Sequence, residues 1–90
     1  MDDARVKRIA DLLEKTEEAH HQAYSATGGE DPEWAEWYSA HMVDELRDVS
    51  GLDLEERDLT QILKTLEERH KNEAPHIPWV TFYAAVIAAI

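Results

Sequence analysis

The chain has 90 residues, of which 43% are hydrophobic and 32% charged, with three glycines, three prolines and no cysteine. This length and apolar content predict one folded domain over residues 1–90, and they exclude a collagenous or an intrinsically disordered chain. Twenty Asp and Glu residues against nine Lys and Arg give a formal net charge of −11. Because such a surface repels phosphate backbones, we expect no binding of nucleic acid, and without cysteine there is no disulfide framework or thiolate site.

The amino-terminal segment MDDARVKRIADLLEK carries charge throughout and lacks the apolar region of a signal peptide. The one long uncharged stretch, residues 79–90, is well short of the roughly 20 apolar residues that cross a bilayer. We therefore expect a cytoplasmic protein with no membrane association.

The first two helices have distinct boundary signals. A first helix is expected from Asp2 or Asp3, either of which could cap it, to about Ser25, before the breaker TGGEDP. A second is expected with Asp31 as N-cap and Pro32 at its first position, ending at Ser50 with Gly51 as C-cap. The apolar face of the first helix comprises Val6, Ile9, Leu13, Thr16, His20 and Ala23.

The second half of the chain predicts two further helices. Asp53 and Glu56 have capping-box spacing and begin a third helix, which Pro75 ends. Pro78 begins a fourth, PWVTFYAAVIAAI, which is apolar nearly all round and is therefore expected in the bundle centre or in a subunit contact. One face of the third helix comprises Leu59, Ile62, Leu63, Leu66 and His70. No segment shows the alternation of a strand, so the expected class is all-α.

The two halves also resemble each other. Ile9, Leu12, Leu13, Glu17, Glu18 and His20 align with Leu59, Ile62, Leu63, Glu67, Glu68 and His70 at an offset of 50 residues. Trp34, Trp37, Tyr38, Ser39 and Ala40 align with Trp79, Phe82, Tyr83, Ala84 and Ala85 at an offset of 45. This pattern predicts a four-helix bundle of two tandem αα-hairpins, residues 3–50 and 53–90, packed around a pseudo-twofold axis.

Two interpretations of the inward-facing histidines remain open. Each follows a glutamate at E-x-x-H spacing, as in di-metal bundles, so a Zn, Fe or Mn site is one hypothesis. Its candidate ligands are Glu17, His20, Glu67, His70, His41 and Glu45. The other hypothesis needs no cofactor: a buried polar centre in which His20 and His70 form hydrogen bonds with Tyr38 and Tyr83.

The aromatic residues cluster at two helix starts and include four candidate partner-binding side chains, Trp37, Trp34, Phe82 and Trp79. Trp34 with Tyr38, and Trp79 with Tyr83, have i, i+4 spacing and share a helix face. Trp37 and Phe82 lie on a different side of their helices, so they are either part of the core or an exposed patch for a partner. The sequence has no Gly-rich phosphate loop, nucleophile elbow or H-E-x-x-H motif, and we expect no enzyme. The acidic clusters at helix starts fit capping, with mimicry of nucleic acid as another possibility.

The segments EEAHHQAY, GGEDPEWAEWYSAHM and PWVTFYAAVI resemble a family of small all-helical bacterial proteins of uncharacterised function. The most specific part is DPEWAEWY, a D-P-x-W-x-x-W-Y motif. The resemblance spans almost the whole chain and implies an all-helical bacterial domain without assigning an activity. Our first hypothesis is a non-enzymatic interaction module that binds a protein partner or a second copy of itself. The alternative is a metal- or small-ligand-binding bundle.

Overall fold

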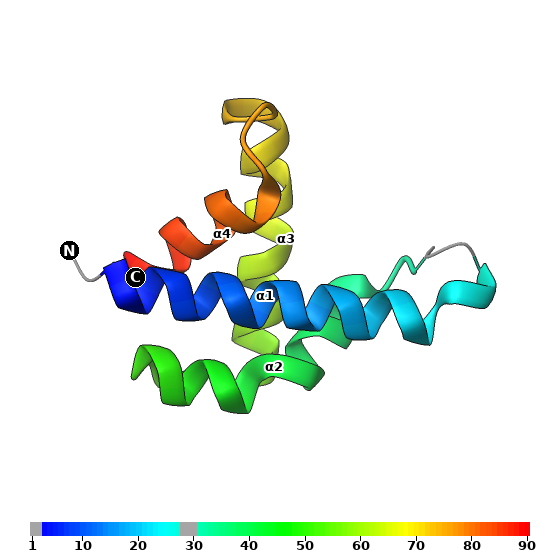
Figure 1. Cartoon of the computed structure of the whole chain (residues 1–90), viewed down its shortest axis with the longest axis horizontal. Coiled ribbons are helices and arrows are strands. Elements are labelled where there is room, and N and C mark those ends of the chain that lie inside the picture. Colours follow the sequence, from blue (N-terminus) through cyan, green and yellow to red (C-terminus); the bar gives the residue numbers. More distant parts are fainter. Residues whose placement is uncertain (1–2, 28–30) are drawn as a thin grey trace.

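A computed structural model describes residues 3–27 and 31–90. The helices are α1 (Asp3–Ala23), α2 (Trp34–Ser50), α3 (Glu56–Glu73) and α4 (Trp79–Ala88), and a short 3-10 turn, η1 (Ser25–Thr27), follows α1 (Figure 1). The described residues contain no strand. The prediction of an all-α protein with four helices is confirmed. The expected cap at Asp2 lies outside the described residues.

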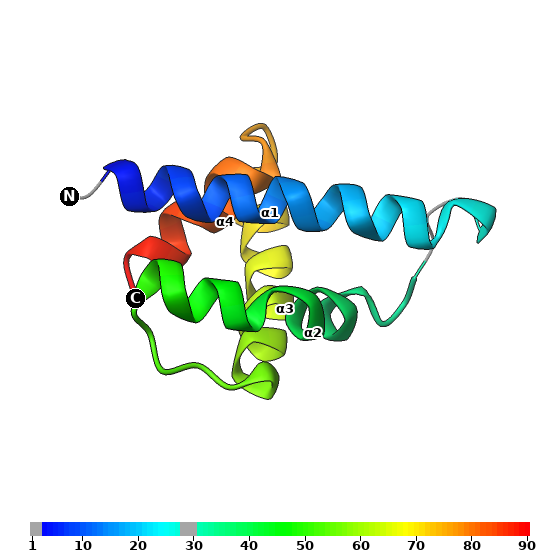
Figure 2. The ribbon, with the colours of Figure 1, turned by 60° about the horizontal axis from the view of Figure 1, so that its bottom comes forward.

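The helices form two hairpins that cross each other. Helix α1 packs against α2 and α4, and α2 also packs against α3. The contacts of α1 with α4 and of α2 with α3 are the two inter-hairpin contacts that a twofold relation predicts. In both views α3 runs across α1 and α2 rather than alongside them (Figures 1 and 2). The bundle is therefore crossed rather than parallel.

All four helices contribute side chains to one core. Pairs at i, i+4 spacing lie on one helix face, and three such pairs have no exposed surface: Ile9 with Leu13, Met42 with Leu46, and Leu59 with Leu63. Ile87 of α4 is equally buried. Burial of each such side chain contributes about 1.5–3 kcal/mol to the free energy of folding. These apolar contacts therefore stabilise the packing of the two hairpins.

The predicted starts of α1 and α4 and the end of α2 are confirmed, whereas the starts of α2 and α3 are displaced. Gly51 follows α2 with φ +72°, the left-handed conformation of a C-cap, and its N–H donates to the Arg47 carbonyl at 2.8 Å. Helix α2 begins at Trp34, not at Asp31 and Pro32, because Asp31 lies in a turn where its Oδ1 accepts the Glu33 N–H at 3.0 Å.

The start of α3 is also later than predicted. The capping residues are Glu55 and Asp58, not Asp53 and Glu56, and Asp58 Oδ2 accepts the Glu55 N–H at 3.1 Å. Both pairs have the same spacing of three residues, so the capping box was predicted correctly in kind but two residues too early. Residues 51–55 form no regular secondary structure.

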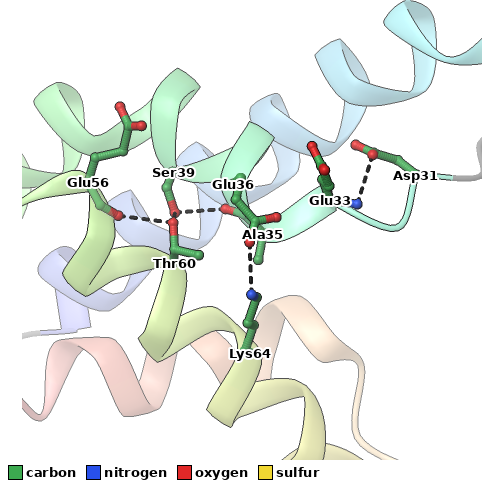
Figure 3. A network of polar contacts seen from close by, with 8 residues as sticks. All are labelled: Asp31, Glu33, Ala35, Glu36, Ser39, Glu56, Thr60 and Lys64. Carbon is green, nitrogen blue, oxygen red and sulfur yellow. Dashed lines mark hydrogen bonds and ion pairs between the residues drawn. The ribbon is translucent and has the colours of Figure 1, made fainter.

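Polar side chains join α2 to α3 where the two helices cross (Figure 3). Ser39 Oγ donates to the Ala35 carbonyl at 2.7 Å, and Thr60 Oγ1 lies 2.8 Å from Ser39 Oγ. Lys64 Nζ lies 2.8 Å from Glu36 Oε1, which lowers the pKa of Glu36. These contacts fix the position of α3 against the first turns of α2.

Helix α4 lies against α1 with one face buried, so the bundle does not enclose it. A subunit contact, the other expectation for this helix, stays a prediction. The buried residues of α4 are Tyr83, Ala84 and Ile87, whereas Thr81 and Ala85 on the other face are exposed. Within the described part of the chain, no helix combines the length and apolar character needed to span a membrane.

Candidate functional site

A pocket of about 310 Å³ opens where the later turns of α1 and α3 meet the first turns of α2 and α4. This volume lies at the lower end of the usual range of small-ligand sites, about 300–1,000 Å³. The lining residues are acidic, aromatic or imidazole side chains from all four helices and the first loop: Glu17, His20, Asp31, Trp34, Tyr38, Glu67, Trp79 and Tyr83. The site therefore requires both hairpins.

Most of this lining consists of residues that the sequence repeat pairs with each other. The pairs are Glu17 with Glu67, Trp34 with Trp79, and Tyr38 with Tyr83. His20 also lines the pocket, but its counterpart His70 does not. The internal repeat thus paired much of the pocket lining, although the sequence predicted a buried polar centre and partner-binding aromatics at these positions rather than a pocket.

Four aromatic rings form a continuous wall along the pocket. Trp34 contacts Tyr38 with ring centroids 5.6 Å apart and planes at 90°, and Tyr38 contacts Trp79 at 6.2 Å and 66°. Trp79 in turn contacts Tyr83 at 5.1 Å and 74°. Edge-to-face contacts of this kind hold each ring against the next, so the wall is fixed by both hairpins.

The two tyrosine hydroxyls are polar groups without a protein partner in the described chain. Tyr38 is 6% exposed and Tyr83 is 5% exposed, and both line the pocket. Burial raises the pKa of each to about 12, with a smaller contribution from Glu17 for Tyr38 and from Glu67 for Tyr83. Both phenols therefore stay protonated at neutral pH and can donate or accept a hydrogen bond.

The three carboxylates of the pocket differ in how fully they are engaged. The Asp31 side chain is 7% exposed and uses both oxygen atoms: Oδ2 lies 3.0 Å from His20 Nε2, and Oδ1 accepts the Glu33 N–H. Glu17 Oε2 accepts the Trp79 indole N–H at 3.0 Å, and Glu67 Oε1 lies 3.6 Å from Lys71 Nζ. Glu17 and Glu67 each keep an oxygen atom that binds no described residue.

The charge in the pocket is negative on balance. The amino-terminal ends of α2 and α4 lie beside it, and each contributes a partial positive charge of about one half. Together they offset about one of the three carboxylate charges, and Lys71, whose Nζ lies 3.6 Å from Glu67 Oε1, offsets part of another. The arrangement therefore favours a cation over an anion.

His20 and His70 anchor the loops of their own hairpins. The ring of His20 binds Asp31, whereas His70 Nε2 donates to the Ile77 carbonyl at 2.5 Å. Their rings contact the tyrosines, with centroids 5.3 Å apart for His20 and Tyr38 and 6.2 Å apart for His70 and Tyr83. The predicted hydrogen bonds to tyrosine are thus replaced by bonds to loop groups, and His70 is half-buried beside the loop.

Three of the six candidate metal ligands, Glu17, His20 and Glu67, line the pocket, whereas His70, His41 and Glu45 do not. Among the described residues, no three carboxylate or imidazole groups are placed to hold a metal ion. Glu45 is exposed and lies 3.3 Å from Lys15 Nζ, while His41 stacks on Trp37 with centroids 4.9 Å apart. The E-x-x-H spacing places Glu17 and His20 in the pocket, but His70 is directed to Ile77.

The predicted partner-binding aromatics divide into two groups. Trp34 and Trp79 line the pocket. Trp37 is half-buried, with its ring centroid 5.1 Å from His20 and 6.3 Å from Tyr24, and Phe82 is half-buried 5.5 Å from His70.

Trp37 is thus partly covered by neighbouring rings, and a partner-binding role for it stays a prediction. Ile90, 55% exposed, is the large hydrophobic residue that stands out at the surface of the described chain. Neighbouring rings cover Trp37 because α1 extends alongside the first turns of α2.

Asp31 is the pocket residue that sequence reasoning assigned to another role. Its position before Pro32 indicated a helix cap, and no local pattern indicated its contact with His20, which lies 11 residues earlier in the chain. Comparisons of the chain with protein-family models, curated proteins and solved structures found no match.

Proposed function

We propose that the protein is a binding domain for organic cations, with an alkylammonium group held in the pocket. The main support is the convergence of an aromatic wall and two incompletely engaged carboxylates, Glu17 and Glu67, in one opening. Ring faces attract ammonium groups, and desolvated contacts of this kind contribute about 2 kcal/mol.

The hydroxyls of Tyr38 and Tyr83 support a cation that carries N–H groups. Both hydroxyls border the pocket and form no hydrogen bond with a described residue, so either oxygen can accept an ammonium N–H. A hydrogen bond to a charged group contributes about 1.5–3 kcal/mol. A quaternary ammonium has no N–H to offer. We therefore expect primary and secondary amines to bind more tightly than tetramethylammonium.

This proposal retains the small-ligand hypothesis from the sequence and replaces the metal by an organic cation. A protein partner would enter as the carrier of a cationic side chain, such as lysine, rather than through Trp37. The formal net charge of −11 favours approach of such ligands. A cytoplasmic location and a bacterial source stay predictions.

The test is titration with butylamine, tetramethylammonium and a lysine-containing peptide, with tryptophan fluorescence as the measure of binding. Two of the three tryptophans line the pocket, and Trp37→Phe removes the signal from the third. The double variant E17Q/E67Q should weaken butylamine binding about tenfold or more, the effect of losing roughly 1.4 kcal/mol.

The matched control is E18Q/E68Q, which makes the same change of charge one residue further along each helix, outside the pocket lining. It should leave the affinity within about twofold, since exposed charges are screened. Equal losses in both double variants would reduce the effect to overall charge and overturn the proposed site. Tighter binding of the peptide than of butylamine would identify a protein-borne cation.

A further inference from the structure

The pocket is built from two halves with the same internal contacts. In the first hairpin, Trp34 contacts Tyr38 at 5.6 Å, and in the second, Trp79 contacts Tyr83 at 5.1 Å. The histidine contacts of the tyrosines recur in the same way, at 5.3 and 6.2 Å between ring centroids.

Each half also supplies one glutamate from the helix that precedes its aromatic pair. Glu17 is on α1 and Glu67 is on α3, at equivalent positions of the repeat. Asp31 has no acidic equivalent, because position 76 is a histidine, and both of its oxygen atoms are already engaged. The repeated halves therefore present two equivalent carboxylates on one aromatic wall.

We propose that the ligand is a linear diamine or polyamine, with one ammonium group bound at Glu17, a second at Glu67, and the intervening methylene chain against the aromatic wall. This inference rests on the proposed function, and it specifies the class of organic cation. It accounts for the duplication of the carboxylate, which a ligand with one charge would not require.

Three terms favour a ligand with two charges. Its two positive charges balance the two glutamates. Each CH₂ group buried against the rings contributes about 0.8 kcal/mol. The second ammonium binds within a molecule that is already held, so it does not repeat the loss of translational freedom.

Two hydroxyls extend this match between pocket and ligand. Tyr38 and Tyr83 are each nine-tenths buried or more and line the pocket. Their hydroxyls form no hydrogen bond with a described residue. One lies in each half, so each ammonium group has a carboxylate and a neutral oxygen as acceptors. A single ammonium would leave one such set unused.

The experiment compares putrescine with butylamine, which has the same carbon chain and one amino group fewer, by isothermal titration calorimetry at fixed ionic strength. Putrescine should bind at least about tenfold more tightly to the full chain. Either single variant, E17Q or E67Q, should reduce putrescine to about the affinity of butylamine. The Gln side chain at position 17 still accepts the Trp79 N–H, so the wall is retained. The control E18Q/E68Q should preserve the tenfold preference.

The possible failures separate the two proposals. Equal affinities for putrescine and butylamine would overturn the diamine assignment and leave the cation site in place. Failure of both amines to bind would overturn the proposed function itself. Competition by Mg²⁺ at the same concentration as putrescine would show attraction to charge alone and would overturn the diamine assignment.

Discussion

Alkaline pH should destabilise the protein through Tyr38 and Tyr83. The pKa of each phenol is raised from 10.0 to about 12, chiefly by burial, so the folded chain holds two protons that the unfolded chain releases above pH 10. Since the unfolded state then binds fewer protons, stability falls as pH rises. The contribution is fully present below pH 10 and is lost on approach to pH 12.

The size of this effect follows from the same shifts. Each tyrosine lowers the free energy of unfolding by about 1.4 kcal/mol per pH unit in that interval. Two tyrosines over two units give at most about 5 kcal/mol, a large part of the 5–15 kcal/mol that is usual for a domain.

Urea unfolding at a series of pH values from 9 upward measures the slope, and ultraviolet absorbance of phenolate follows the titration itself. Lysines titrate in the same interval, so the control is the double variant Y38F/Y83F, in which the slope should flatten. A variant that keeps the slope of the natural chain would refute this explanation, as would ionisation of Tyr38 and Tyr83 near pH 10 in the folded protein.

Two further predictions concern the fold. Gly51→Ala should cost about 1 kcal/mol, because φ is +72° although an added Cβ meets no atom within 4 Å, and Gly51→Asn should cost less, since Asn adopts this conformation more readily. Equal costs in denaturant unfolding would contradict this explanation. Leu63→Ala should cost about 2–5 kcal/mol because Leu63 is fully buried, whereas Ile90→Ala should cost under about 1 kcal/mol. Comparable losses at Leu63 and Ile90 would show that the assigned core is wrong.

Much of the candidate site could be predicted from the repeat, and particular contacts could not. The alignment paired Glu17 with Glu67 and Trp34 with Trp79, and all four line the pocket. It did not reveal that the paired aromatic positions border an opening, because side-chain spacing along one helix says nothing about the distance to another hairpin.

The histidines illustrate the same limit. Both lie at the same register, yet His20 binds a carboxylate and His70 binds the Ile77 carbonyl. The two loops differ in length by five residues, so they bring different groups to equivalent rings. The orientation of each histidine ring depends on the loop group that it binds, which helical spacing does not predict.

Local sequence signals determined the four helices, their apolar faces and the C-cap at Gly51, because periodicity and backbone preference act within a few residues. Tertiary structure decided the crossing of α3 over α1 and α2 (Figures 1 and 2), the partial burial of Trp37 and the pocket between the hairpins. These features depend on how side chains of separate helices interlock. That packing involves residues far apart in the chain, so a local sequence pattern does not predict it.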